Sequence, residues 1–316
     1  MKRFRKVALI GVGLIGGSFA MALRRAGAAV SIVGVDRDAQ AVERATALGV
    51  IDTAAESASD AVRGAELVIV AVPVRAVGGV LHDVGLALDA GAVVTDVGST
   101  KSDIVRTARA ELRGLFPRFV PGHPIAGRES SGVEAATADL FKAARVVLTP
   151  EADTAADALD AVRAAWETVG ARVSLLSAQD HDRIFASVSH LPHLLSFALV
   201  SELAGRENAA ELFGFAAGGF RDFTRIAASD PTMWRDIFLG NKEGVMEMLR
   251  RFSRDLEELK AAIEAGDGDT LYRRFTDART IRRGIIAAGQ DTPAPDFGRA
   301  HGGNPGPADG ESGKSK

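Results

Sequence analysis

The sequence predicts an α/β domain followed by an all-helical domain. Three observations support this prediction. An apolar run near the start leads through a glycine-rich turn into an amphipathic helix pattern. Strand-like and helix-like segments then alternate to about residue 177, which is typical of a mostly parallel sheet with helices on both faces. From there to about residue 288 only helical periodicity is found, which indicates a second domain of different architecture.

The first 36 residues have the pattern of a dinucleotide-binding turn. An apolar run, a helix pattern and a second apolar run follow one another over residues 6–11, 14–26 and 30–35. Gly11 permits a tight strand-to-helix turn, Gly13 leaves room for a pyrophosphate, and Gly16 allows the helix to pack closely on the strand. Asp36, twenty residues after Gly16, suits the ribose hydroxyls. Structural βαβ turns can share the glycine spacing, but this order of elements favours a Rossmann-like nucleotide site.

The choice of cofactor depends on Asp36 and its neighbour Arg37. A carboxylate repels the 2′-phosphate of NADP, whereas an arginine beside the ribose can accommodate it. Arg37 can equally be a solvated residue at the start of the next helix, so the sequence favours NAD. The residues predicted to contact the cofactor lie in the first turn and at strand ends: Gly11, Gly13, Leu14, Ile15, Gly16, Asp36, Arg37, Val72 and Pro73.

Composition excludes several other classes of protein. The chain has 316 residues, 47% of them hydrophobic, a formal net charge of −3 and no cysteine. This balance predicts no nucleic-acid surface, and the lack of cysteine excludes disulfides and thiolate chemistry. Basic residues before the first apolar run resemble a signal peptide, but the glycine spacing and Arg24-Arg25 fit a buried strand and helix better. Without an uninterrupted apolar run of transmembrane length, we expect a cytoplasmic protein with no membrane partner.

Strands and helices are predicted in order along the first half. After Asp36, helices are expected to about Leu48 and over 59–63, 74–88, 102–115 and 154–169. Strands are expected over 66–72, 92–96, 118–121, 145–149 and 172–176. In open sheets of this kind, ligands bind beyond the carboxyl ends of the strands. Polar motifs at those ends are therefore the candidates for chemistry.

The chain beyond residue 177 is predicted to be helical. Ser177 with Asp180 resembles a capping box at the start of the first helix. The segment His193–Leu203 is apolar on nearly every side, which suggests burial from several directions and packing against a second subunit. The last residues are rich in Pro, Gly and charge, as disordered tails are. The predicted division is a nucleotide-binding domain over 1–177, a helical dimerisation domain over 178–289 and a disordered tail over 290–316.

Two polar motifs follow strands of the first domain. In DVGSTK, residues 96–101, Ser99 either lies near the reacting centre or takes part in an ordinary helix cap. In GHPIAGRE, His123 follows a short strand, and Pro124 keeps it out of helical geometry. A single histidine is more often structural, but a neutral imidazole at this place can take a proton from a substrate hydroxyl.

The helical half contributes three further polar segments: His181-Asp182, Ser189–His193 and Gly218–Arg225. Zinc would suit clustered histidines, but Pro192 interrupts the helical presentation of His190 and His193, and no HExxH-like spacing occurs. We therefore predict no metal. Arg225 suits bidentate binding of a carboxylate, although Asp222 and Arg225 can equally form a surface i,i+3 pair.

With these motifs in order, the sequence resembles the prephenate/arogenate dehydrogenase family of tyrosine biosynthesis. The most specific segments are GVGLIGGS, TDVGSTK, GHPIAGRE, HDRIFASVSHLPH and GFRDFTRIAASDPTMWRDI. The resemblance implies an α/β Rossmann-like dinucleotide-binding domain followed by an all-helical dimerisation domain, with the active site between them. The implied reaction is NAD-dependent oxidative decarboxylation of prephenate to 4-hydroxyphenylpyruvate by a homodimer.

The resemblance also implies roles for individual residues. His123 matches the family's catalytic histidine and Ser99 the serine beside it. The residues implied at the substrate are Glu129, which gates or orders the pocket, His193 and Arg225, which hold substrate, and His181 and Asp222 in supporting positions. At position 128 the family often has a small or polar residue, so Arg128 makes the pocket more positive if it points inward.

Alternative functions remain open at this point. Arogenate carries an ammonium where prephenate has a keto group, so the chain can also be an arogenate or broad cyclohexadienyl dehydrogenase; Arg128 and Arg225 favour the keto acid. A β-hydroxyacid dehydrogenase shares the two-domain plan, but its catalytic lysine is expected on the first interdomain helix, and residues 177–203 contain no lysine. A non-catalytic NAD(H)-binding protein would bind nucleotide without substrate-dependent reduction.

Overall fold

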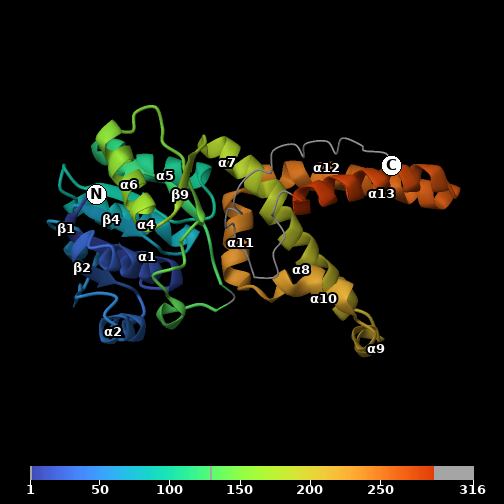
Figure 1. Cartoon of the computed structure of the whole chain (residues 1–316), viewed down its shortest axis with the longest axis horizontal. Helices are drawn as coiled ribbons and strands as arrows, with labels where there is room; N and C mark the ends of the chain where they lie inside the picture. The colour runs from blue at the N-terminus through green and yellow to red at the C-terminus, as the bar shows by residue number, and fades with distance from the viewer. Residues whose placement is uncertain (1, 129, 288–316) are drawn as a thin grey trace, which may run out of the picture.

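A six-stranded parallel sheet forms the centre of the N-terminal half of the computed structural model, which describes residues 2–128 and 130–287 (Figure 1). The strand order is β3-β2-β1-β4-β5-β6. The strands are β1 (Phe4–Ile10), β2 (Ala29–Val35), β3 (Thr53–Ala54), β4 (Leu67–Val70), β5 (Val93–Asp96) and β6 (Phe119–Val120). Every neighbouring pair is parallel, as the alternation of strands and helices predicts. Two predictions, the gating role of Glu129 and the disordered tail over 290–316, lie outside the described residues.

Both faces of this sheet are buried, because alternate residues of the inner strands point to opposite sides. In β1, Leu9 belongs to one apolar core with Phe19 and Trp166, whereas Ile10 belongs to a second core with Leu81. The covering helices are α1 (Leu14–Arg25), α2 (Ala39–Ala47), α3 (Ala58–Val62), α4 (Val77–Ala87), α5 (Ser102–Leu112) and α6 (Ala156–Thr168). Short 3-10 turns are η1 (Val74–Ala76), η2 (Arg113–Arg118) and η3 (Val133–Ala135).

The strands after residue 121 do not extend the parallel sheet as predicted. They form a second sheet, in the order β7 (Gly122–Ile125), β8 (Arg145–Leu148), β9 (Arg172–Leu175), with β7 antiparallel to β8. Pro121 separates β6 from β7 and has no N–H for a ladder, while its carbonyl accepts the N–H of Thr149 at 3.0 Å. His123 follows the short strand β6, as predicted, but it also lies inside a further strand, β7, opposite Val147.

The described chain beyond residue 177 is helical, as predicted. Ser177 caps the first helix by accepting the N–H of Asp180 at 3.0 Å, which confirms the predicted cap. Figure 1 shows α8 with α9 and α10, and α12 with α13, extending away from the sheet. The elements are α7 (Ala178–Phe185), η4 (Ala186–His190), α8 (Leu191–Ala204), α9 (Ala209–Gly214), α10 (Gly218–Thr224), η5 (Arg225–Ala228), α11 (Pro231–Gly240), α12 (Lys242–Ala265) and α13 (Gly268–Ile285).

A continuous helical segment of 27 residues, Ala178–Ala204, leads from the sheet into the helical half. Pro192 does not end this helix, but the turn before it, which carries His190, is not a simple α-helical one. In η4, a π-helical turn, the N–H of Leu191 donates to the carbonyl of Ala186, five residues earlier, and this wider turn accommodates a proline that has no N–H. Length and mean hydropathy would also suit a membrane span, but His181 and Asp182 near its start are buried within the protein.

The side chains of α8 are less buried than the sequence predicts. Only Leu191 and Ser196 of this helix are buried within one chain, and Leu194, Leu195 and Phe197 are half-buried. Burial from several directions is therefore not provided by the described part of one chain. An apolar helix that its own chain covers only in part is typical of an interface.

Candidate active site

The glycine-rich turn between β1 and α1 has the geometry of a phosphate-binding turn. Gly11 has φ +94°, and a Cβ there would lie 2.3 Å from the carbonyl oxygen of Ala71. A Cβ on Gly16 would lie 2.4 Å from the carbonyl oxygen of Gly11. A Cβ on Gly13, by contrast, would meet nothing within 4 Å. The first and third glycines are thus required by packing, while Gly13 borders open space at the N-terminus of α1, where a dinucleotide phosphate fits.

Asp36 stands at the end of β2, beside this turn. Its Oδ2 accepts the N–H of Val12 and its Oδ1 accepts the N–H of Asp38, each at 3.0 Å. The carboxylate is therefore fixed next to the glycine-rich turn and keeps lone pairs for ribose hydroxyls. Arg37 is exposed. Of the other residues predicted at the cofactor, Leu14, Ile15 and Val72 are half-buried and Pro73 is exposed.

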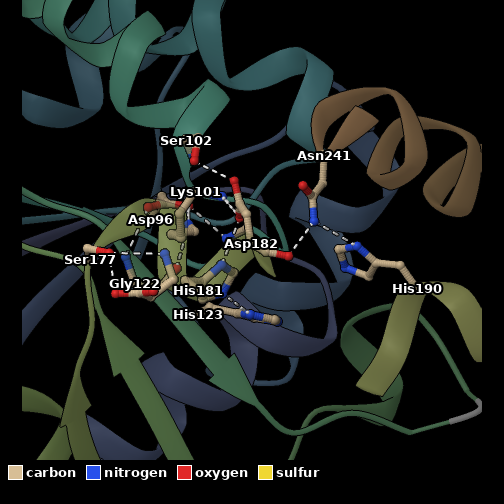
Figure 2. Close-up of polar contacts among 12 residues, drawn as sticks. Asp96, Lys101, Ser102, Gly122, His123, Ser177, His181, Asp182, His190 and Asn241 are labelled. Atoms are coloured by element: carbon tan, nitrogen blue, oxygen red, sulfur yellow. Dashed lines mark hydrogen bonds and ion pairs between the residues drawn. The ribbon is translucent and has the colours of Figure 1, made fainter. Parts of the chain in front are cut away.

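A buried ion pair lies at the carboxyl end of β5 (Figure 2). The Lys101 ammonium contacts the Asp96 carboxylate and donates to the carbonyl of Gly122 at 2.8 Å. Asp96 in turn accepts the N–H of Gly98 at 2.8 Å and that of Gly122 at 3.1 Å. This pair ties the turn that carries Ser99 to the strand that carries His123.

Asp182 reaches across from α7 and caps α5. Its Oδ1 accepts the N–H of Lys101 and its Oδ2 the N–H of Ser102, each at 2.8 Å. Neither Ser99 nor Thr100 caps this helix, so the alternative interpretation of DVGSTK as an ordinary cap is wrong. A carboxylate at a helix N-terminus is stabilised by the helix dipole and by unpaired amides. The contact joins the start of the helical half to the first domain.

Three side chains form a hydrogen-bonded row, Asp182–His181–His123. His181 Nδ1 is 2.8 Å from Oδ1 of Asp182, and His181 Nε2 is 2.8 Å from Nδ1 of His123 (Figure 2). A carboxylate only accepts, so His181 carries its proton on Nδ1, and its Nε2 then accepts from Nδ1–H of His123. The remaining nitrogen of His123, Nε2, is left with a lone pair. Nε2 is therefore the atom at which His123 can accept a proton.

Burial and nearby positive charge keep both histidines neutral. Burial is the main cause that holds the pKa of His123 well below 6.5, and His181, Lys101 and His190 act in the same direction. Burial also lowers the pKa of His181, with Lys101 adding to the effect and Asp182 opposing it. A ring that is neutral near pH 7 can accept a proton from a substrate.

A second polar contact holds the π-helical turn. The side-chain amide of Asn241 donates to the carbonyl of Asp182 at 2.7 Å and lies 3.1 Å from Nδ1 of His190. Burial lowers the pKa of His190 to about 4. Asn241 lies between α11 and α12, so this contact fixes the helix that carries His181 against the rest of the helical half.

The residues predicted to hold substrate are only partly gathered by the structure. The His193 ring stacks on Trp234, with ring centroids 3.6 Å apart. Burial is the main cause that lowers the pKa of His193, and the positive charge of Arg225 acts in the same direction. Asp222 is exposed and pairs with its neighbour Arg221 at 3.3 Å. Ser99 is half-buried and Arg128 is exposed.

Sequence reasoning missed several members of this site. The structure adds Asp96, Lys101, Asp182, Asn241 and Trp234. Trp234 Nε1 is buried and has no hydrogen-bond partner within the part of the chain that is described. All of these added residues except Asn241 belong to quoted motifs, but their contacts span up to 81 residues of sequence, and no local pattern predicts them. Among residues 2–128 and 130–287, no group of three His, Asp or Glu side chains is arranged to hold a metal ion.

Known proteins match this chain over most of its length. Cyclohexadienyl dehydrogenase of Zymomonas mobilis is 38% identical over 284 residues, covering 89% of this chain and 96% of the relative. Prephenate dehydrogenase of Bacillus subtilis is 37% identical over 281 residues, covering 88% of this chain and 76% of the relative. The crystal structure of A. aeolicus prephenate dehydrogenase in complex with hydroxyphenyl propionate and NAD+ has a TM-score of 0.84 at 40% identity, covering 89% and 98% of the two chains. Synechocystis arogenate dehydrogenase has a TM-score of 0.76 at 29% identity, covering 89% and 99%.

Two family descriptions account for the two halves. The prephenate dehydrogenase nucleotide-binding domain matches residues 19–175, and the prephenate dehydrogenase dimerization domain matches residues 177–277. The order of these matches agrees with the Rossmann-like sheet followed by helices. The chain therefore belongs to the prephenate dehydrogenase family, as the resemblance of its motifs predicts.

Proposed function

We propose that this chain is an NAD-dependent prephenate dehydrogenase, which converts prephenate and NAD+ to 4-hydroxyphenylpyruvate, CO2 and NADH. The observation that carries the proposal is the row Asp182–His181–His123, because it leaves Nε2 of His123 with a lone pair for the ring hydroxyl of the substrate. The A. aeolicus relative, solved with hydroxyphenyl propionate and NAD+, supports the choice of substrate class and cofactor.

His123 performs the proton chemistry in this mechanism. Its Nε2 accepts the proton of the 4-hydroxyl while the C4–H bond breaks. The bond between the ring and its carboxylate then breaks, CO2 leaves, and the ring becomes aromatic. His123 returns the proton to the phenolate oxygen, which regenerates the base. NAD+, when bound, supplies the hydride acceptor. Aromatisation drives the reaction, so the protein chiefly needs to orient the substrate and to hold a base.

The cofactor is held by the turn between β1 and α1. The open space at Gly13 and the free amides at the N-terminus of α1 suit the pyrophosphate. The fixed carboxylate of Asp36 suits the ribose hydroxyls and disfavours a 2′-phosphate. This supports NAD over NADP.

The remaining residues position the substrate. Ser99, half-buried after β5, hydrogen-bonds the reacting hydroxyl or the base, and His181 holds the His123 ring. Arg225 and His193 anchor carboxylates, since a guanidinium binds them bidentately. Glu129 gates or orders the pocket, and Asp222 has a supporting role.

Arogenate oxidation is the second candidate function. It is favoured by the similarity to Synechocystis arogenate dehydrogenase and by the Zymomonas mobilis relative, a cyclohexadienyl dehydrogenase. The two substrates differ by a keto group and an ammonium away from the ring. The base, the nucleotide turn and the carboxylate anchors serve either substrate.

The working form in this proposal is a homodimer built through the helical half. The match to a dimerization domain over 177–277 and the partly covered apolar side chains of α8 support it. We place the nucleotide-binding domain over 1–177 and the helical domain over 178–289. A cytoplasmic location belongs to the same proposal, because the reaction draws on the cell's NAD pool.

The test is NADH absorbance when the full chain and NAD+ meet prephenate and, separately, arogenate, with NADP+ in parallel. Reduction of NAD+ with a higher kcat/KM for prephenate than for arogenate supports the proposal. Comparable kcat/KM for both substrates makes the chain a broad cyclohexadienyl dehydrogenase. No reduction with either substrate overturns the proposed function and leaves the fold unaffected.

A further inference from the structure

The buried centre of this site holds an unequal number of charges. Asp96 and Lys101 are fully buried, and Asp182 is 5% exposed. The two carboxylates face a single ammonium, so the group has a net charge of −1 while His123, His181 and His190 are neutral. Burying an uncompensated charge lowers the stability of the fold, so the excess carboxylate implies a functional reason for its presence.

The excess charge can be assigned to Asp182. The ammonium of Lys101 contacts Asp96 and the carbonyl of Gly122, whereas only the backbone N–H of Lys101 contacts Asp182 (Figure 2). The other partners of the Asp182 carboxylate are the N–H and the side chain of Ser102 and Nδ1 of His181. Among the described residues no lysine or arginine side chain pairs with the Asp182 carboxylate, which lies at the far end of the row that leads to His123.

We propose that Asp182 is a positioning residue that acts through His181 and provides the counter-charge for the proton that His123 takes from the substrate. This inference rests on the proposed function, in which His123 Nε2 is the base. When His123 becomes an imidazolium, the net charge of the buried group changes from −1 to zero. The carboxylate is in place beforehand, so no solvent or side chain has to rearrange as the charge develops.

The row of hydrogen bonds carries this effect without a second proton transfer. Nδ1–H of the His123 imidazolium donates to Nε2 of His181, and Nδ1–H of His181 donates to Asp182. Lys101 acts in the opposite direction, because its positive charge disfavours protonation of both rings. A protonated His190 would also disfavour protonation of His123, whereas the negative charge of Asp96 favours protonation of His181. Among these groups, Asp182 alone is both negative and hydrogen-bonded into the row.

The first test is Asp182→Asn in the full-length dimer. An asparagine oxygen at the Oδ1 position keeps the contacts to Lys101 N–H and to His181, but the negative charge is lost. We expect kcat to fall by about 10²-fold, with the KM values for prephenate and NAD+ changed by less than about threefold. The acid limb of kcat/KM moves to lower pH, because loss of a nearby negative charge destabilises the imidazolium of His123.

The matched control is Asp180→Asn, on the same helix. The Asp180 side chain is 51% exposed and pairs with Arg183 at 2.7 Å, so kcat is expected to stay within about twofold. A general loosening of α7 would lower kcat without moving the acid limb downward. An unchanged kcat in Asp182→Asn, or an acid limb that stays or moves upward, overturns the proposal.

A substrate-free measurement separates this inference from the proposed function. In 15N spectra of histidine-labelled wild-type protein near pH 7, His123 and His181 are both expected as Nδ1–H tautomers, assigned by His123→Asn and His181→Asn variants. An Nε2–H tautomer on either ring overturns the row, whatever the enzyme activity. If the tautomers are as expected and neither prephenate nor arogenate is oxidised, the proposed function has failed while the row stands.

Discussion

The ring of His123 is held neutral by its surroundings, and this has a direct consequence for turnover. We expect His123→Ala to lower kcat by about 10²–10⁴-fold, the usual contribution of a positioned base, while NAD+ still binds. In wild-type protein the acid limb of kcat/KM lies below pH 6.5, because burial lowers the pKa of His123. Steady-state kinetics over pH and NAD+ titration by fluorescence check both expectations.

A histidine outside the site provides the control. His82 is an exposed residue of α4 that contacts Glu111 at 3.0 Å, so His82→Ala removes an imidazole without touching the row. Its kcat should remain within about twofold of wild type. Retention of wild-type turnover in His123→Ala would remove His123 from the role of base.

At the scale of elements, variants of the β1–α1 turn distinguish the glycine that borders the nucleotide space from the glycine that packing requires. Gly13→Ala adds a Cβ with nothing within 4 Å in the absence of nucleotide, so the fold is expected to persist. The same Cβ occupies the space of the pyrophosphate, and the Kd for NAD+ should rise at least about tenfold. Isothermal titration and a thermal melt measure the two effects.

Gly11→Ala is the contrasting variant. Its Cβ would lie 2.3 Å from a backbone oxygen at φ +94°, so the protein is expected to lose stability whether or not NAD+ is present. If Gly13→Ala bound NAD+ as tightly as wild type, the pyrophosphate would have to lie elsewhere.

Elements with strong local patterns were predictable from the sequence, and those set by distant contacts were not. The Ser177 cap and the glycine-rich turn are local, and both are found as predicted. The second sheet and the π-helical turn depend on how the chain accommodates Pro121 and Pro192. Proline predicts a local break in either case, but tertiary packing decides whether the chain starts a new sheet or widens a helical turn.

The candidate site shows the same limit. His123, His181 and His193 were identified by their motifs, but the partners that give them chemistry are distant in sequence. His123 and His181 are 58 residues apart, and Asn241 and Asp182 are 59 residues apart. A motif supplies the residue type, whereas the tautomer and the protonation state follow from neighbours that only the fold provides.

At the scale of the whole molecule, buried neutral histidines make stability depend on pH. Burial lowers the pKa of four histidines: His123, His181, His190 and His193. The unfolded chain therefore binds more protons than the folded one below pH 6.5, and the free energy of unfolding falls as pH decreases. For His190, with its pKa at about 4, the loss amounts to about 3 kcal/mol once the pH is below that value.

Urea unfolding between pH 6.5 and 4 measures this slope. Carboxylates with lowered pKa values, such as Asp182 and Glu66, add to the fall only below about pH 5, so the slope between pH 6.5 and 5 belongs to the histidines. In His190→Asn, the Asn oxygen keeps an acceptor for Asn241 but does not titrate, so the slope should flatten. A wild-type free energy of unfolding that is constant over this range would contradict neutral burial of these rings.

The helical half finally predicts how two chains assemble. Helices α12 and α13 lead away from the sheet (Figure 1). Two apolar side chains of α13, Tyr272 and Phe275, are 75% and 57% exposed. These two residues are three apart and share one face of α13, so Tyr272→Glu with Phe275→Glu places two charges on that face. A charge buried at an interface without a partner is strongly unfavourable, so the double variant is expected to run as a monomer of 33.0 kDa, whereas wild type runs at about twice that mass by light scattering.

Leu86→Glu, at a position 72% exposed on α4 of the first domain, is the matched control and should stay dimeric. A wild-type monomer would contradict dimerisation itself, and a double variant that stays dimeric would move the interface to α8, the other incompletely covered apolar helix.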